Sequence, residues 1–254
     1  MAGHIIVSDE EATRTIVMRR PEKKNALTEE MFLAMSEAIS SAQSDPDIRC
    51  LILTGRSGVF TAGEDIADFI SEAATGLDPE KPRNSSVFLR ALVNNKKPIV
   101  AAVDGVAVGI GTTIVLHCDF VIAGTTASFL SPFVRYGLVP EGASSLLLPR
   151  MAGHQRAFSM LVMGRPMSAD EAREAGLVNA VVAPGHAIIE AQKVAREICA
   201  LPAEVVAISR RLLKLPTEEL LRRMGQEEHL FRERMSAPSV VAAFRNFLSR
   251  KKHR

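Results

Sequence analysis

The sequence predicts an α/β fold in which a mostly parallel sheet is built from strands that alternate with helices. Short apolar segments at residues 50–55, 99–105 and 119–124 each end in a glycine and lead into a stretch with helical spacing. After residue 150 the chain becomes mostly helical. Such alternation favours crossover helices, and ligands of these sheets bind beyond the carboxyl ends of the strands. We therefore look for the site in the turns that follow residues 50–55 and 99–105.

The N-terminal segment is expected to form a β-hairpin followed by an amphipathic helix. HIIVS (4–8) and RTIVMRR (14–20) are rich in Ile, Val and Thr. Thr28 is a candidate N-cap, and Glu29 and Glu30 suit the positive end of the helix that follows. Apolar residues then recur every three or four positions, at Met31, Phe32, Met35, Ile39 and Ala42.

The second half of the chain is expected to be helical with one strand. Ser168 and Glu171 have capping-box spacing, and AGLVNAVV (175–182) interrupts the helical pattern. Prolines divide the rest into helices expected at residues 184–200, 202–213, 217–235 and 237–250. The apolar positions of the final helices predict packing on the core or on a partner subunit.

Composition limits the classes of function. A chain of 254 residues with 47% hydrophobic residues suits one large domain, or one domain with a small appendage. The net charge of +2, from 31 basic and 29 acidic residues, gives no overall field toward nucleic acid or an anionic membrane. The longest apolar run, residues 106–116, is about half of a membrane span. We expect a protein that binds neither nucleic acid nor membrane.

The cysteines and the N-terminus indicate a reducing compartment. Cys50, Cys118 and Cys199 are far apart, without metal-ligand spacing, so no zinc or other metal site is expected. The N-terminal residues resemble neither a signal peptide nor a transit peptide. These features predict a cytoplasmic protein.

Two glycine-containing turns are candidates for presenting backbone N–H groups. GVFTAGEDIADF (58–69) turns through Ala62 and Gly63 before a helix expected to begin near Glu64. GVAVGIGTTIVLHCD (105–119) repeats the design. Taken alone, the first turn is more simply explained as ordinary strand-to-helix punctuation, and close helix packing explains the glycines of the second at least as well. Two such turns on adjacent strands would converge to form an oxyanion hole.

Two further groups of charged residues have both a structural and a functional interpretation. Arg19, Arg20, Lys23 and Lys24 form either a solvated surface or a site for a phosphorylated ligand. Glu141 lies in a Pro-Glu-Gly sequence that is most simply an exposed turn. Its apolar neighbours make partial burial plausible, and burial would raise the pKa of the carboxyl toward neutrality, as a proton shuttle requires.

Taken together, these segments resemble the crotonase superfamily, also called the enoyl-CoA hydratase/isomerase family. The motifs are RPEKKNAL, LILTG with FTAGEDI, KPIVAAVDGVAVGIGTTIVLHCDFVIA, ASFLSPFVRYGLVPEGASSLLLPRMAG and GRPMSADEAREAGLVNAVV. The resemblance implies a spiral of ββα units over residues 1–195 and a helical trimerisation region over residues 196–254. It also implies homotrimers or dimers of trimers, and acyl-CoA thioester substrates that carry their own coenzyme A, with no other cofactor.

The resemblance assigns roles to individual residues by position. The oxyanion donors would be the backbone N–H groups of Glu64 and Ile110, and the helix at 64–74 with the loop at 75–86 would shape the acyl tunnel. The residues expected to bind the CoA and acyl parts are Lys24, Ala26, Ala62, Gly63, Asp65, Ile66, Gly109 and Phe133.

Two departures from the family pattern favour isomerisation over hydration. Hydratases of the family hold a water between two glutamates, and those positions are Thr113 and Phe133 here. LVPEGASS instead resembles the segment that carries the single catalytic glutamate of the peroxisomal-type 3,2-enoyl-CoA isomerases, which makes Glu141 the expected catalytic residue. A hydratase, another crotonase reaction and a non-catalytic acyl-CoA-binding protein are the alternatives.

Overall fold

The computed structural model describes residues 3–75, 81–240 and 242–244. The strands are β1 (Ile5–Glu10), β2 (Thr13–Met18), β3 (Cys50–Gly55), β4 (Ile99–Val103), β5 (Val106–Val108), β6 (Phe120–Gly124), β7 (Ser128–Leu130), β8 (Met167–Ser168) and β9 (Ala180–Val182). The helices are α1 (Glu29–Ser44), α2 (Ile66–Thr75), α3 (Asn84–Asn94), α4 (Ile110–His117), α5 (Ser144–Ala152), α6 (His154–Leu161), α7 (Ala169–Glu174), α8 (Ala187–Ala200), α9 (Ala203–Leu213) and α10 (Thr217–Met235), with 3-10 turns η1 (Pro21–Lys23) and η2 (Phe133–Tyr136).

A six-stranded sheet with the order β1-β2-β3-β4-β6-β9 confirms the α/β prediction. The β1–β2 hairpin is antiparallel, and every later pair in this sheet is parallel. A smaller sheet has the order β5-β7-β8, and an isolated bridge adds Thr61 beside β5. Successive passes of the chain therefore place one strand in the large sheet and the next in the small one, as in a spiral of ββα units.

The expected strand at 99–105 is divided between the two sheets. β4 ends at Val103, and β5 begins at Val106 in the small sheet. Gly105 makes the change of direction: its φ is +64°, and a Cβ there would lie 2.2 Å from the carbonyl oxygen of Gly58. We expected the two candidate turns directly after residues 50–55 and 99–105, at the edge of the large sheet. Each turn instead follows the next extended segment of the chain and lies beyond the small sheet.

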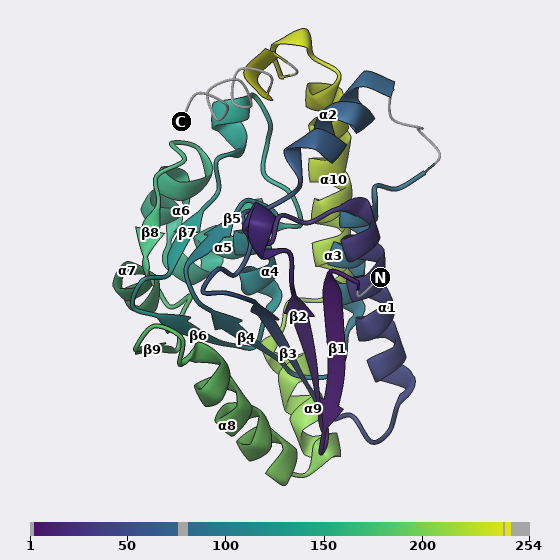
Figure 1. Cartoon of the computed structure of the whole chain (residues 1–254), viewed down its shortest axis with the longest axis vertical. Coiled ribbons are helices and arrows are strands. Elements are labelled where there is room, and N and C mark those ends of the chain that lie inside the picture. Colours follow the sequence, from purple (N-terminus) through teal and green to yellow (C-terminus); the bar gives the residue numbers. More distant parts are fainter. Residues whose placement is uncertain (1–2, 76–80, 241, 245–254) are drawn as a thin grey trace.

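Alternate residues of the central strands face two different layers of helix. Cys50, Ile52, Val100 and Ala102 pack against α8, which lies below the sheet in Figure 1. The intervening residues, such as Leu51 and Leu53, join the main core with α1, α3 and α4. Both faces of the sheet are covered, which explains why these strands are apolar along their whole length.

The N-caps that the sequence predicts are confirmed. The Thr28 hydroxyl accepts the N–H of Met31, at 3.3 Å, and Ser168 and Glu171 form the complete capping box. By contrast, α2 begins at Ile66 and not near Glu64, because the Asp65 carboxylate accepts the N–H of Ala67, at 2.8 Å, and caps the helix there.

Several expected boundaries differ from the structure. The loop predicted over 75–86 ends earlier, since α3 begins at Asn84, while its residues 76–80 lie outside the described residues. The helix predicted over 237–250 is helical at 238–240 and 242–244, and the rest of it lies outside the described part. The strand expected within 175–182 is reduced to β9.

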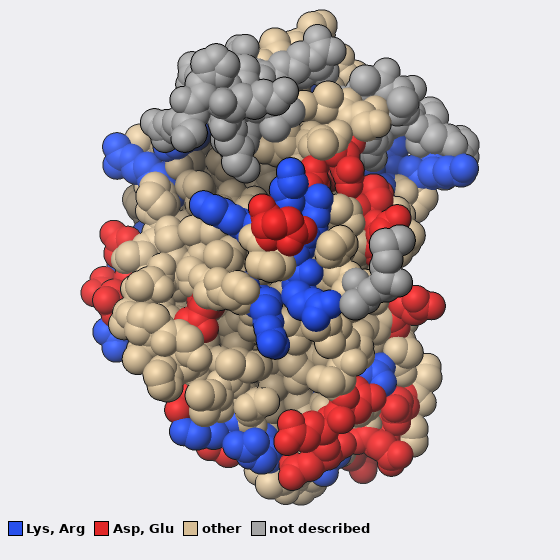
Figure 2. Space-filling model, viewed as in Figure 1, with Lys and Arg blue, Asp and Glu red and all other residues tan. Residues whose placement is uncertain are grey.

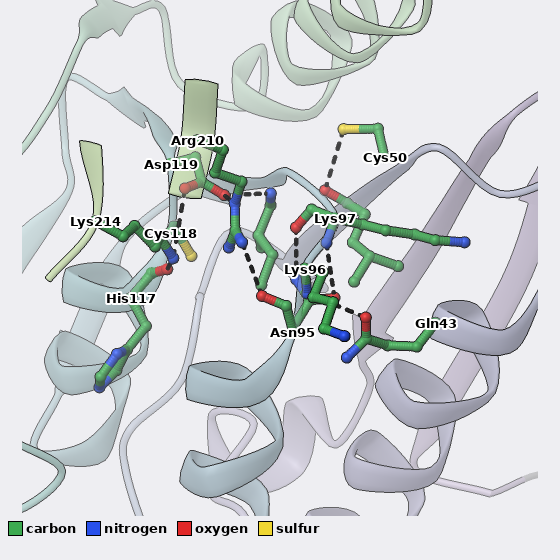
Figure 3. A network of polar contacts seen from close by, with 12 residues as sticks. Gln43, Cys50, Asn95, Lys96, Lys97, His117, Cys118, Asp119, Arg210 and Lys214 are labelled. Atoms are coloured by element: carbon green, nitrogen blue, oxygen red, sulfur yellow. Dashed lines mark hydrogen bonds and ion pairs between the residues drawn. The ribbon is translucent and has the colours of Figure 1, made fainter. Parts of the chain in front are cut away.

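The C-terminal helices are attached to the sheet by buried side chains and a polar network. α10 buries a stripe consisting of Leu220, Met224, Glu227, Phe231 and Met235. Figure 3 shows the network, in which Asp119 accepts from Arg210 at 2.7 Å and pairs with Lys214 at 3.4 Å. Asp119 also accepts the N–H of Ile99, at 2.8 Å, so the network joins α9 to the start of β4. No helix of the described residues is long and apolar enough to cross a membrane.

Asn25 organises the loop that contains η1. Its backbone is left-handed, with φ 54°, and its side chain is buried. The carboxamide accepts the N–H of Arg20 at 2.8 Å and donates to the carbonyl oxygens of Arg56 at 2.9 Å and Val59 at 2.7 Å. Asparagine tolerates left-handed backbone better than most residues, which suits it to this position.

Replacing Asn25 by alanine is expected to lower the free energy of unfolding by about 3 kcal/mol, because three buried hydrogen bonds lose their partner. Urea unfolding of the purified variant measures this. Lys24→Ala is the matched control, since Lys24 has the same left-handed backbone, with φ 52°, but an exposed side chain. Equal losses in both variants would contradict this account.

Candidate active site

Two segments from different repeats of the spiral lie side by side at the end of the small sheet. The N–H of Thr61 donates to Val106, and the N–H of Val108 donates to Thr61, each at 3.0 Å. The contact continues along the chain, because a Cβ on Gly63 would lie 2.8 Å from the carbonyl oxygen of Val108. Since the segments are parallel, this register places Glu64 next to the segment that leads to Ile110.

The backbone of Glu64 is held from one side. Leu27 donates its N–H to Gly63 and accepts the N–H of Asp65, both at 2.8 Å. In a parallel bridge of this kind, the N–H of the residue between the two bonded positions points away from the partner strand. The N–H of Glu64 is thereby directed toward the side on which β5 lies.

Ile110 supplies the second predicted N–H group. It is the first residue of α4, so its N–H has no acceptor within the helix, and it lies at the positive end of the helix dipole. Gly109 before it has φ 56° and ψ −117°, a conformation that residues other than glycine rarely adopt. The structure therefore brings together the two predicted N–H-presenting turns.

The loop expected to bind the adenosine part of CoA lies beside the Glu64 segment. The N–H of Ala62 donates to the carbonyl oxygen of Lys24, at 2.9 Å, and the hydroxyl of Thr61 donates to that of Asn25, at 2.7 Å. Of the predicted CoA-binding residues, Lys24, Ala26, Ala62 and Gly63 thus share one edge of the molecule.

The basic cluster is only partly a surface feature. Arg20 turns inward, donates to the Asp65 carboxylate at 2.5 Å and donates to the carbonyl oxygen of Ala26 at 3.2 Å. Burial works to raise the pKa of Asp65, but the hydrogen bonds from Arg20 and from the backbone at Ala67, together with the positive charge of Arg20, outweigh it, and the pKa lies below its ordinary value. Lys23 and Lys24 remain exposed, and several Lys and Arg side chains gather around the centre of the face shown in Figure 2.

Glu141 is buried, contrary to the simplest interpretation of its sequence as an exposed turn. It lies between η2 and α5 with 8% of its surface exposed. Burial raises the pKa of Glu141 to about 8, and the nearby negative charge of Glu64 adds to the effect. A carboxyl with this pKa exchanges a proton readily near neutral pH.

The turn that carries Glu141 packs against α4. Gly142 has φ +64°, and a Cβ there would lie 2.6 Å from the Cγ2 methyl of Thr113. The Nε2 of His117 donates to the carbonyl oxygen of Gly142, at 2.7 Å. Burial lowers the pKa of His117 to about 4, so this imidazole is a neutral hydrogen-bond donor. One helix therefore positions both the Ile110 N–H and the Glu141 turn.

Arg83 was not identified from the sequence, although it is central to the charge distribution. It is 4% exposed, pairs with the Glu64 carboxylate and has its guanidinium 5.7 Å from the Phe69 ring centroid and 5.2 Å from that of Phe231. Its positive charge partly offsets the burial that raises the pKa of Glu141. No pattern in the sequence marks this arginine, because its partners come from distant segments.

Glu227 is the other residue that was missed, and here the sequence contains a signal. It occupies an interior position of the apolar stripe of α10, where a carboxylate stands out. Its oxygens accept the N–H groups of Ala143, at 2.5 Å, and Ser145, at 3.0 Å. An acid in an apolar stripe indicates a buried polar contact.

An apolar cluster lies next to these groups. Phe133 and Phe69 each pack against Phe231 in a T-shaped arrangement, with centroid distances of 6.5 Å and 6.3 Å, and Ile66 packs against the same cluster. A Cβ on Gly109 would lie 3.9 Å from Phe133. The predicted acyl-binding residues Ile66, Gly109 and Phe133 therefore surround one region.

Other reactive groups provide little alternative chemistry. Within the described ranges, no group of three or more His, Cys, Asp or Glu residues could hold a metal ion. Burial raises the pKa values of the Cys50 and Cys118 thiols to about 12, so both stay protonated.

Comparisons with known proteins identify the family of the chain. Residues 9–254 match the family described as enoyl-CoA hydratase/isomerase. The chain is 34% identical to 1,2-epoxyphenylacetyl-CoA isomerase of Escherichia coli over 80% of this chain and 78% of that protein. It is 32% identical to human enoyl-CoA delta isomerase 2 over 97% of this chain, which spans 64% of that protein's length. The structure of Pseudomonas aeruginosa OdaA superposes with a TM-score of 0.92 at 38% identity, over 97% of this chain and 99% of that one.

The family match covers both sheets of the spiral and the helices that follow them, including the Glu64, Ile110 and Glu141 segments. The helical and sheet content agrees with that of solved structures of the same family. The chain belongs to the enoyl-CoA hydratase/isomerase family, and thus to the crotonase superfamily.

Proposed function

We propose that this protein converts 3-enoyl-CoA thioesters into trans-2-enoyl-CoA thioesters, with Glu141 as the proton shuttle. The observation that carries this proposal is the buried carboxyl of Glu141, with a pKa of about 8, on a turn that packs against the helix beginning at Ile110. That arrangement combines a base of suitable pKa with a site for negative charge on the thioester oxygen.

The two N–H groups would stabilise the enolate that forms in the reaction. Removing a proton from the α-carbon of a 3-enoyl thioester spreads negative charge onto the thioester oxygen. The N–H groups of Glu64 and Ile110 would donate to that oxygen, each with a contribution of about 3 kcal/mol to transition-state stabilisation. Both belong to fixed backbone, so no side chain has to reorganise during the step.

Glu141 would take the α-proton and return it to the γ-carbon. The electron pair of the broken α C–H bond forms the new α,β double bond, and the electrons of the original β,γ double bond capture the returned proton. The reaction is balanced without water, metal or a further cofactor. One carboxyl therefore suffices.

Hydration has less support from the residues around the site. Thr113 donates its hydroxyl to the carbonyl oxygen of Gly109, at 3.4 Å, and Phe133 is part of the apolar cluster. Neither position supplies a carboxylate to activate a water. Two relatives whose names describe isomerases support the same choice.

The CoA part of the substrate would lie along the edge formed by Lys24, Ala26, Ala62 and Gly63. Lys24 is exposed there and would contact phosphate, while the Arg20–Asp65 pair keeps the neighbouring turn in place. The acyl chain would extend past Gly109 toward Ile66 and Phe133, where the lining is apolar.

Glu141→Gln is expected to lower kcat for 3-hexenoyl-CoA roughly 100-fold or more, because the amide cannot accept the α-proton. The rise in conjugated-enoyl absorbance measures the rate, and calorimetry with hexanoyl-CoA, which does not react, is expected to show unchanged binding. A variant with the wild-type rate would refute the role of Glu141.

The same wild-type protein mixed with crotonyl-CoA provides the control for reaction type. We expect no loss of the enoyl absorbance, since no second carboxylate activates water. Loss of that absorbance would support the hydratase alternative, and bound CoA without turnover of any enoyl thioester would support a non-catalytic binding protein.

The value of kcat/KM is expected to rise with pH and level off above about pH 8, because Glu141 must be deprotonated to act as the base. Rates from pH 6 to 10 test this, and a rate that falls over pH 7 to 9 would contradict it.

The stability of the fold should change with pH in the opposite direction to the rate. Between about pH 4.5 and 8 the folded chain keeps a proton on Glu141 that the unfolded chain has lost, so the free energy of unfolding falls as pH rises.

We further propose that the protein is a homotrimer or a dimer of trimers. α9 has no buried residue, although Leu212 and Leu213 at its end are apolar and are 78% and 87% exposed in the single chain. The double variant Leu212→Glu/Leu213→Glu is expected to be monomeric by light scattering. Val7→Glu, at an exposed position of the edge strand β1, should leave the mass unchanged. A monomeric wild type would contradict the proposal.

A further inference from the structure

Glu227 of α10 makes a buried contact that the proposed proton transfer does not use directly. It is 6% exposed, and its two carboxylate oxygens accept from Ala143 N–H, Ser145 N–H and the Ser145 hydroxyl. Burial raises the pKa of Glu227, and the hydrogen bonds from Ser145 and Ala143 oppose this rise. These donors belong to the N-terminal turn of α5, directly after Glu141.

The chain between Glu141 and α5 adopts a conformation that needs support. Gly142 has φ 64°, and Ala143 has φ 62°, so two successive residues are left-handed. This conformation is unfavourable for alanine by roughly 1 kcal/mol. The turn closes with a hydrogen bond from Ser144 N–H to the Glu141 carbonyl oxygen, at 3.1 Å. The Glu227 carboxylate binds the N–H of the alanine in this strained position.

The turn is held from two sides by helices that are distant in sequence. On one side, α4 contributes the His117 hydrogen bond to Gly142 and the Thr113 methyl. On the other side, α10 contributes Glu227. Loss of the Glu227 contact would leave two backbone N–H groups without their acceptor and allow the turn to relax away from α4.

We propose that Glu227 is a positioning residue, which holds the turn at residues 141–144 so that the Glu141 carboxyl faces the reacting carbons. The inference rests on the proposed function, because it assigns Glu141 a proton transfer whose geometry matters. It also gives helix α10 an indirect part in catalysis, through the turn.

Glu228 provides a matched comparison on the same helix. It pairs with Arg90 at 3.2 Å and Arg232 at 3.4 Å and, among the described residues, forms no hydrogen bond with the turn. The negative charges facing Glu141 are Glu64, Glu227 and Glu228, and the positive charge is Arg83, while Arg223 faces Glu227. Neutralising Glu227 or Glu228 therefore removes one negative charge near Glu141, but only Glu227 also supports the turn.

The test compares Glu227→Gln with Glu228→Gln in the full-length protein. In Glu227→Gln the NH2 group would face an N–H donor, so kcat for 3-hexenoyl-CoA is expected to fall about tenfold, while KM stays within about threefold. Glu228→Gln should keep kcat within about twofold. The pH midpoint of kcat/KM should move downward in both variants, because each loses a negative charge near Glu141.

Hydrogen exchange by mass spectrometry gives a second readout that requires no turnover. The amides of residues 142–146 should exchange faster in Glu227→Gln than in the wild type and at the wild-type rate in Glu228→Gln. Ser145→Ala, which removes one of the three donors, should lower kcat about threefold and keeps the test available if Glu227→Gln fails to fold.

Two results would overturn the inference: an unchanged kcat in Glu227→Gln and Ser145→Ala, or an equal loss of kcat in Glu228→Gln, which would make charge alone responsible. Failure of the proposed function looks different. In that case the wild type has no isomerase activity or Glu141→Gln keeps the full rate, whereas the exchange measurement still reports whether Glu227 holds the turn.

Discussion

The geometry of the candidate site depends on the parallel contact between Thr61 and β5. Two backbone hydrogen bonds fix this register, and each segment then turns through a glycine. The N–H groups of Glu64 and Ile110 follow from it, since each lies three residues beyond the paired position. Because the proposed donors are backbone atoms in two adjoining repeats of the spiral, their role does not depend on the side chains at these two positions. In this chain one of them is a glutamate that pairs with Arg83.

Burial of charge near the site lowers stability and at the same time raises the pKa on which the proposed chemistry depends. Burial and the neighbouring Glu64 raise the pKa of Glu141, and Arg83 limits the rise. Burial keeps His117 neutral, whereas the hydrogen bonds from Ser145 and Ala143 oppose the rise that burial causes in the pKa of Glu227. In the proposed reaction, the raised pKa of Glu141 lies at the position where a proton would be exchanged.

Local signals in the sequence predicted much of the fold and part of the site. The Thr28 cap, the Ser168 capping box and the α/β class are confirmed, because they depend on neighbouring residues and on apolar periodicity. The strands of the small sheet have only two or three residues each, too few for a periodic pattern. Arg83 and Glu227 were missed because their partners lie far away along the chain. The burial of Glu141 likewise comes from tertiary packing.

A crystal structure with bound hexanoyl-CoA, a saturated thioester that cannot be isomerised, tests the central claim most directly. The account predicts that the thioester oxygen lies about 3 Å from the N atoms of both Glu64 and Ile110. A Glu141 carboxylate oxygen should lie within about 3.5 Å of the α-carbon and close to the γ-carbon, on one face of the acyl chain. A thioester oxygen bound elsewhere, or a Glu141 side chain directed away from both carbons, would contradict it.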